Sequence, residues 1–165
     1  MIDEDGRNWE ALFSRQRMVS TVSVDDHTQL WNTISNHPYA DNVGSTIMAL
    51  GDVVMIEPGT YKAGLFANSK TLFMLDDLHG TLQCTTVLEC ELDGEAERRV
   101  MYVKETGGGV LRVVGLKLNN GYGGNYVGGI GGGMNIEGAT VELAMCAIEN
   151  NEASQVSDML VRTSH

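Results

Sequence analysis

The chain has 165 residues, a net charge of −11 and a pI near 4.6, with 42% apolar and 20% charged residues. This balance excludes a disordered chain, and no apolar run reaches the roughly 20 residues that a membrane-spanning helix needs. The acidic charge argues against nucleic acid as a partner, because phosphate binding needs clustered Lys and Arg. The 20 glycines, set against 2 prolines and 6% aromatic residues, indicate a turn-rich β protein.

The first part of the chain is expected to be a polar leader, residues 1–24. Residues 1–7 are acidic and lack the basic-then-apolar profile of a signal peptide, which leaves the compartment open between a protein not secreted by that route and a processed chain.

Residues 25–50 are expected to form a capping helix and a linker. The helix is predicted over 26–36, where Leu30, Trp31 and Ile34 make an apolar stripe at helical spacing. Asp25 or Asp26 can cap its start, and His37-Pro38 ends it.

From residue 51 onward short apolar runs recur, each bounded by Gly, Asn or charged residues. They are too short for helices and rich in Val, Ile and Leu, which is typical of strands. These strands fill the range 51–154 and leave residues 155–165 as a C-terminal tail. The expected strands are 53–56, 72–75, 86–92, 100–103, 110–118, 134–136 and 140–148.

An internal repeat with a period of about 30 residues indicates the architecture. Residues 101–103 align with 134–136, and after a three-residue adjustment in the loop Asn120-Gly121 aligns with Asn150-Asn151. A repeat built of strands without an intervening helix predicts stacked coils of an all-β solenoid, and Asn suits the left-handed corner of each coil. The inward positions Leu111, Val113, Leu116 and Leu118 align with Val141, Leu143, Cys146 and Ile148.

Two segments carry a resemblance to a known family. Residues 51–61, Gly-Asp-Val-Val-Met-Ile-Glu-Pro-Gly-Thr-Tyr, resemble the entry segment of right-handed parallel β-helix proteins of the pectate-lyase-like superfamily. Residues 131–143 and 148–153 are similar to the coil repeats of polymorphic outer-membrane proteins. The resemblance spans residues 22–154. It implies a short right-handed single-stranded parallel β-helix with an N-terminal capping helix.

The resemblance leaves activity open, because this superfamily holds lyases, hydrolases, esterases, adhesins and scaffolds. The best-placed acids are Glu89, Glu91 and Asp93, which share one strand face at i, i+2 and i+4 and would make a solvated acidic strip or a site for a hard cation. A lyase of this family also needs a cation beside its acids, and Arg98-Arg99 is expected in the loop after the strip. The motifs of the chain do not place an acid, a base and a cation together in one site. Neither catalysis nor a metal or other cofactor is therefore expected.

The cysteines show no metal-binding or disulfide pattern. Cys84, Cys90 and Cys146 are an odd number without a C-x-x-C pair. We expect three small, buried, unpaired side chains; a Cys84–Cys90 bridge would need an oxidising compartment.

These observations predict a non-catalytic binding or structural β-helix module that acts through contact with another protein, as a subunit of a larger assembly. Besides the acidic strip, the expected contacts lie in the glycine-rich loop, at Tyr122, Asn125 and Tyr126. The alternative is a carbohydrate-active module, either lyase- or hydrolase-like or a glycan binder. The last coil, residues 134–148, lacks a capping signal, so we expect a partner or a further segment to cover it.

Overall fold

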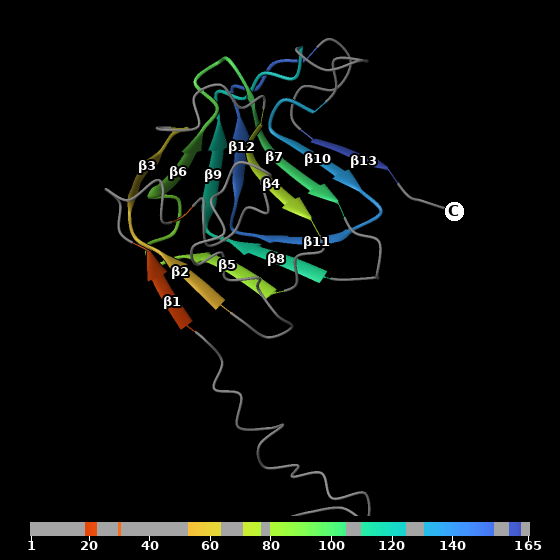
Figure 1. Ribbon diagram of the computed structural model, residues 1–165. Helices are drawn as coiled ribbons and strands as arrows, with labels where there is room; N and C mark the ends of the chain where they lie inside the picture. The colour runs from red at the N-terminus through yellow and green to blue at the C-terminus, as the bar shows by residue number, and fades with distance from the viewer. Residues whose placement is uncertain are drawn as a thin grey trace, which may run out of the picture.

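The computed structural model describes residues 19–22, 30, 53–63, 71–76, 80–104, 110–124, 131–153 and 159–162, and these are almost entirely β-structure (Figure 1). The strands form three sheets in which all paired neighbours are parallel. The strands are β1 (Val19–Val22), β2 (Val53–Ile56), β3 (Gly59–Tyr61), β4 (Thr71–Asp76), β5 (Gly80–Cys84), β6 (Cys90–Asp93), β7 (Arg99–Lys104), β8 (Val110–Val114), β9 (Leu116–Asn119), β10 (Met134–Glu137), β11 (Thr140–Ala144), β12 (Ala147–Glu149) and β13 (Met159–Arg162).

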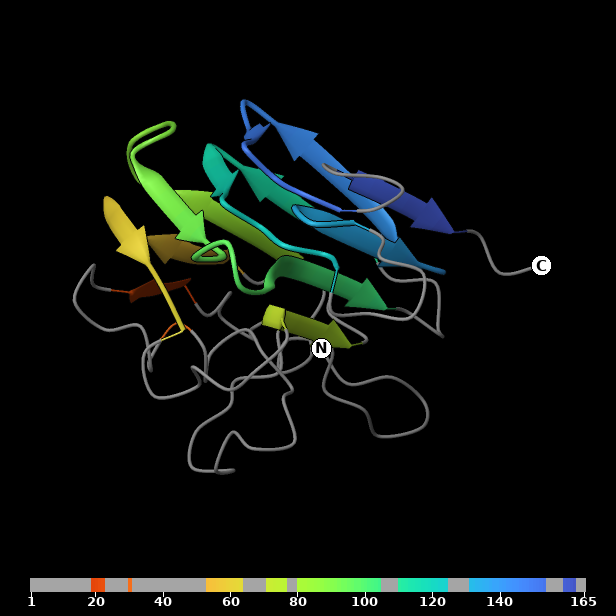
Figure 2. The same cartoon turned by 90° about the horizontal axis from the view of Figure 1, so that it is seen from above.

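The chain visits the three sheets in a fixed order. Sheet 1 has the order β1-β2-β5-β8-β11, sheet 2 the order β3-β6-β9-β12 and sheet 3 the order β4-β7-β10-β13. From β2 onward, each set of three consecutive strands therefore contributes one strand to each sheet, and we call such a set a tier. The first tier is β2–β4 and the fourth is β11–β13. Figure 2 shows the tiers succeeding one another from yellow to blue.

The register of the strands confirms the alignment drawn from the sequence. Met101 pairs with Met134 and Val103 with Ile136 where β7 meets β10. Leu111 pairs with Val141 where β8 meets β11, and Leu118 pairs with Ile148 where β9 meets β12. The offset of about 30 residues is thus the distance along the chain between paired strands.

Alternating side chains of each strand fill the space between the sheets. In β5, Gly80, Leu82 and Cys84 are buried while Thr81 and Gln83 are half-exposed, as the two-residue period of a strand requires. The core is mostly Leu, Val, Ile and Met from all three sheets. Burying these side chains supplies the main favourable free energy of folding.

Sharp corners lie between the sheets at left-handed residues. Gly115 and Met145 turn the chain from sheet 1 to sheet 2, with φ of 70° and 54°. Asn120 and Asn150 follow the strands of sheet 2, with φ of 52° and 53°. The Asn150 side-chain N–H donates to Asn119 Oδ1 at 2.9 Å, which links the third and fourth tiers. The predicted asparagine corners are therefore confirmed.

Three predicted strands had wrong bounds, two of them because a corner divides an apolar run. Residues 110–118 form β8 and β9, separated by Gly115, and residues 140–148 form β11 and β12, separated by Met145 and Cys146. In residues 86–92 only Cys90 begins a strand, and β5 before it was not expected. Apolar side chains continue through a corner, so hydrophobicity alone does not mark it.

The sheets extend beyond the range 51–154 in both directions. β1 lies in the segment expected as a leader and pairs with β2, whereas β13 lies in the expected tail and pairs with β10. In the predicted capping helix, Leu30 is helical and completely buried in the core. Trp31 and Ile34 lie outside the described residues.

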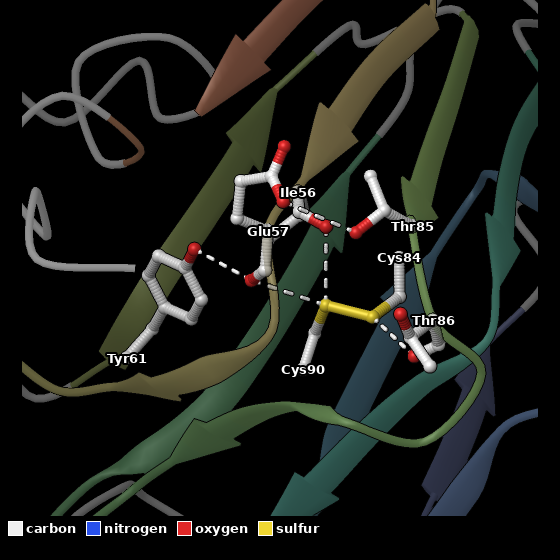
Figure 3. The surroundings of a disulfide bond; sticks show 7 residues. All are labelled: Ile56, Glu57, Tyr61, Cys84, Thr85, Thr86 and Cys90. Carbon is white, nitrogen blue, oxygen red and sulfur yellow. Dashed lines mark hydrogen bonds between the residues drawn. A yellow bond between two sulfur atoms is a disulfide. The ribbon is translucent and has the colours of Figure 1, made fainter. Parts of the chain in front are cut away.

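Cys84 and Cys90 form a disulfide, so the expectation of three unpaired cysteines was wrong (Figure 3). Cys84 ends β5 and Cys90 begins β6, and the turn between them brings their Cα atoms to 5.7 Å. Both residues are buried, as expected, and Cys146 is unpaired and half-buried. Next to the bridge, Thr85 N–H donates to Ile56 O at 2.9 Å, which ties the second tier to the first.

Candidate interaction surface at the fourth tier

The predicted acidic strip is divided between a strand and a corner. Glu91 and Asp93 alternate on β6 with the buried Cys90 and Leu92. Glu91 is half-buried, and Asp93 is buried, with 7% exposure, so it is not part of a solvated strip. Glu89 lies before the strand and is exposed. The structure therefore brings together two of the three acids.

Both carboxylates on β6 have partners from neighbouring tiers. The Asn119 amide donates to Glu91 Oε1 at 2.5 Å, and the Asn120 amide donates to Asp93 Oδ1 at 3.2 Å. Lys62 Nζ lies 3.5 Å from Asp93 Oδ2. Within the described ranges, no group of three or more His, Cys, Asp or Glu side chains is arranged to hold a metal ion.

The tyrosines and asparagine of the glycine-rich loop are only partly described. Tyr122 is half-buried, its backbone N–H donates to Arg98 O at 2.8 Å, and it forms an isolated parallel bridge with Glu152. Asn125 and Tyr126 lie outside the described residues. The structure thus places Tyr122 in the framework beside sheet 2.

The expected loop cations are buried. Arg98 is 2% exposed and forms ion pairs with Glu95 and Glu97, and Arg99 begins β7. The Arg99 guanidinium donates from Nε to Gly131 O at 2.8 Å and lies over the Tyr102 ring. Both arginines thus make contacts within the fold.

The fourth tier exposes apolar side chains that face the core in the tiers before it. Leu143 on β11 is 37% exposed, whereas Val113, its register partner on β8, is completely buried. Val141 and Ile148 are half-buried and pack against the core, and their partners Leu111 and Leu118 are buried. β11, β12 and β13 are each the last strand of their sheet. Within the described part of the chain, this end therefore combines unpaired strand edges with exposed apolar residues.

The outward face beside this end is charged. Arg112 Nε on β8 donates to Glu142 Oε2 on β11 at 2.8 Å, and Arg112 Nη2 lies 2.7 Å from the same oxygen. In sheet 2, Lys117 Nζ lies 3.8 Å from Glu149 Oε1. Each pair joins a base of the third tier to an acid of the fourth, so Glu142 and Glu149 give the edges of β11 and β12 an acidic rim.

An apolar corner adjoins the fourth tier. Met145, which turns the chain after β11, is 63% exposed, and Val87 and Leu88 in the corner after β5 are 47% and 41% exposed. Leu88 N–H donates to Gly115 O at 2.7 Å, and Gly115 N–H donates to Ala144 O at 2.9 Å. The corners of the second, third and fourth tiers are therefore linked in series. Sequence periodicity did not reveal this surface, since Leu88 was expected within a strand over residues 86–92.

Comparison with known proteins does not place the chain in a family. No family model matches it, and no curated protein and no solved structure matches it. In the described part of the chain, no helix is long and apolar enough to cross a membrane. The case for function therefore rests on the geometry of the fourth tier.

Proposed function

We propose that the chain is a right-handed parallel β-helix, with the tiers as its coils, and that it is a non-catalytic module that binds another protein through the fourth tier. The cyclic order of the three parallel sheets supports the helical architecture. The resemblance of residues 51–61 and 131–143 to the pectate-lyase-like superfamily supports its right-handed winding.

One row of side chains carries the functional part of the proposal. Val54, Leu82, Val113 and Leu143 occupy equivalent positions in the four tiers of sheet 1. The first three are at most 3% exposed, and Leu143 is 37% exposed. A soluble stack of parallel strands normally covers such an end, because uncovered edges and apolar residues promote association.

The contacts of the charged groups support the non-catalytic part of the proposal. Glu91 and Asp93 accept hydrogen bonds from Asn119 and Asn120, and Arg98 is buried against Glu95. A general acid or base must reach a substrate proton, and these groups are held by the fold instead.

The test is a capture experiment with two matched variants. Leu143→Asp charges the fourth tier, and Val110→Asp charges a residue of equal exposure, 37%, on β8. We expect wild type and Val110→Asp to retain the same protein from a native extract, identified by mass spectrometry, and Leu143→Asp to lose it. Circular dichroism establishes that both variants are folded. Equal capture by the two variants would contradict the proposal.

Tyr102 favours glycan binding as the second candidate function. It lies half-buried on β7, and its hydroxyl donates to Glu137 Oε2 at 2.6 Å, an aromatic and a carboxylate side by side on sheet 3. A glycan array separates the two functions. Binding that Tyr102→Ala removes and Leu143→Asp leaves intact would favour the glycan.

A further inference from the structure

The free edge of β11 is the starting point for identifying the kind of partner. β11 is the last strand of sheet 1 and pairs with β8 on one side. A parallel strand uses alternate backbone groups on each of its sides, so an edge strand presents unpaired N–H and C=O groups to an incoming strand. Strand addition to a sheet edge is a common way of binding an extended peptide.

The inward residues of β11 define two apolar positions on that incoming strand. Val141 and Leu143 remain partly exposed, whereas in the third tier Leu111 is 1% exposed and Val113 is completely buried. The difference between these pairs is the presence of a further tier over Leu111 and Val113. An added strand with apolar residues opposite Val141 and Leu143 would bury them in the same way.

The outward residue between Val141 and Leu143 is Glu142, and its charge favours a basic residue at the facing position of the incoming strand. Both contacts from Arg112, which lies in the third tier, are made to the same oxygen of Glu142, Oε2. Acids and bases alternate along one row of register positions in sheet 3. The register positions of sheet 3 hold in turn Asp76, Lys104, Glu137 and Arg162. In sheet 1, Arg112 and Glu142 are likewise a base followed by an acid, so a basic residue opposite Glu142 would continue the alternation.

A second copy of this chain fits the edge poorly. Head-to-tail stacking needs an uncovered first tier, but Tyr61 and Phe73 there are at most 1% exposed. Tail-to-tail stacking brings the acidic rim of Glu142 and Glu149 against itself in a chain of net charge −11. Like charges opposed across strands are destabilising.

We propose that β11 accepts an extended strand from a different polypeptide, with the pattern apolar–basic–apolar opposite Val141, Glu142 and Leu143. This proposal rests on the proposed function, because it names the chemistry of the protein that binds the fourth tier.

Two peptides taken from the chain itself test the charge pattern. One copies Val110–Val114, Val-Leu-Arg-Val-Val, which already pairs with β11 on its other side; the other copies Thr140–Ala144, Thr-Val-Glu-Leu-Ala. Both carry identical Gly-Ser flanks and a fluorophore. Fluorescence anisotropy measures their binding to wild type and to Glu142→Arg, an exposed substitution whose fold is checked by circular dichroism.

We expect the arginine peptide to bind wild type about tenfold more tightly than the glutamate peptide, and the preference to reverse with Glu142→Arg. Hydrogen exchange should slow at β11 amides when the favoured peptide is present. Leu143→Asp should weaken both peptides.

The proposal is overturned if neither peptide binds, or if the preference does not reverse. Its failure is distinct from failure of the proposed function. Protein capture that depends on Leu143, without a peptide preference that depends on Glu142, means that the fourth tier binds a protein in another way. If capture of the protein does not depend on Leu143, the proposed function itself is wrong.

Discussion

The two ends of the stack of tiers have similar strands and different surroundings. In the first tier, Ile56 and Tyr61 are completely buried and Phe73 is 1% exposed, and Leu30 lies in the same core. In the fourth tier, Leu143 is 37% exposed and Ile148 is half-buried. Both ends place apolar side chains inward at the same register positions. What differs is whether anything lies over them.

This difference shows that burial at an end of the stack is not a property of the strand sequence. Val113 and Leu143 occupy paired positions, yet one is completely buried and the other is not. An end strand with a core-like pattern therefore marks either a covered end or a binding surface. Under our proposal the first tier is a covered end and the fourth tier is a binding surface.

The largest effect is expected from substituting the same residue type inside the stack and at its end. Leu82→Ala should lower the free energy of unfolding by about 2–5 kcal/mol, because it removes a completely buried side chain and leaves a cavity. Leu143→Ala, in the same row, should cost about 1–1.5 kcal/mol, because that side chain is already partly in water. Urea unfolding of both variants checks this. Equal losses would mean that the fourth tier is as well covered as the second.

The cysteines allow the next comparison, because Cys90 and Cys146 occupy equivalent positions two tiers apart. Cys90 is buried in the disulfide with Cys84, and Cys146 is unpaired and half-buried. Reduction should lower the free energy of unfolding by about 2–3 kcal/mol, since the bridge closes a short loop in the unfolded chain. Native alkylation followed by mass spectrometry should give one adduct, on Cys146. Three adducts without reductant would show that the bridge is absent.

The smallest effect is expected at the charged rim. Arg112 and Glu142 have side chains 57% and 50% exposed, so Glu142→Gln should change the free energy of unfolding by less than about 1 kcal/mol. Added salt should reduce this difference further, because exposed pairs are screened. Thermal unfolding at low and high salt measures it. A larger, salt-independent loss would make Glu142 part of the fold instead of a residue available to a partner.

Much of the fold could be predicted from the sequence, because pairing between tiers repeats the same residue types. The alignment of Val103 with Ile136 and the left-handed Asn120 and Asn150 follow from strand periodicity and turn chemistry. The division of 110–118 at Gly115 could not be read from hydrophobicity, since Leu116 after the corner is as apolar as Val113 before it. The disulfide was missed because the proximity of Cys84 and Cys90 depends on how the corner turns.

The candidate surface was less accessible to prediction. The sequence indicated that residues 134–148 lack a cap, but the choice of Leu143 and Glu142 needed their exposure and the contact with Arg112. The acidic strip was misjudged for a physical reason. Asn119 and Asn120 come from the next tier, about 30 residues away in the chain, and a strand pattern does not show which side chains a neighbouring tier brings to Glu91 and Asp93.

The corner between Cys84 and Cys90 has a consequence for protein engineering. The third and fourth tiers turn from sheet 1 to sheet 2 around Gly115 and Met145, whereas the second tier uses a longer segment closed at its base by the disulfide. The strands on either side keep their register despite this extra length. The second tier's corner thus accommodates additional sequence while the bridge fixes both of its ends. This makes it the natural position for grafting a foreign peptide, displayed at the surface as a constrained loop.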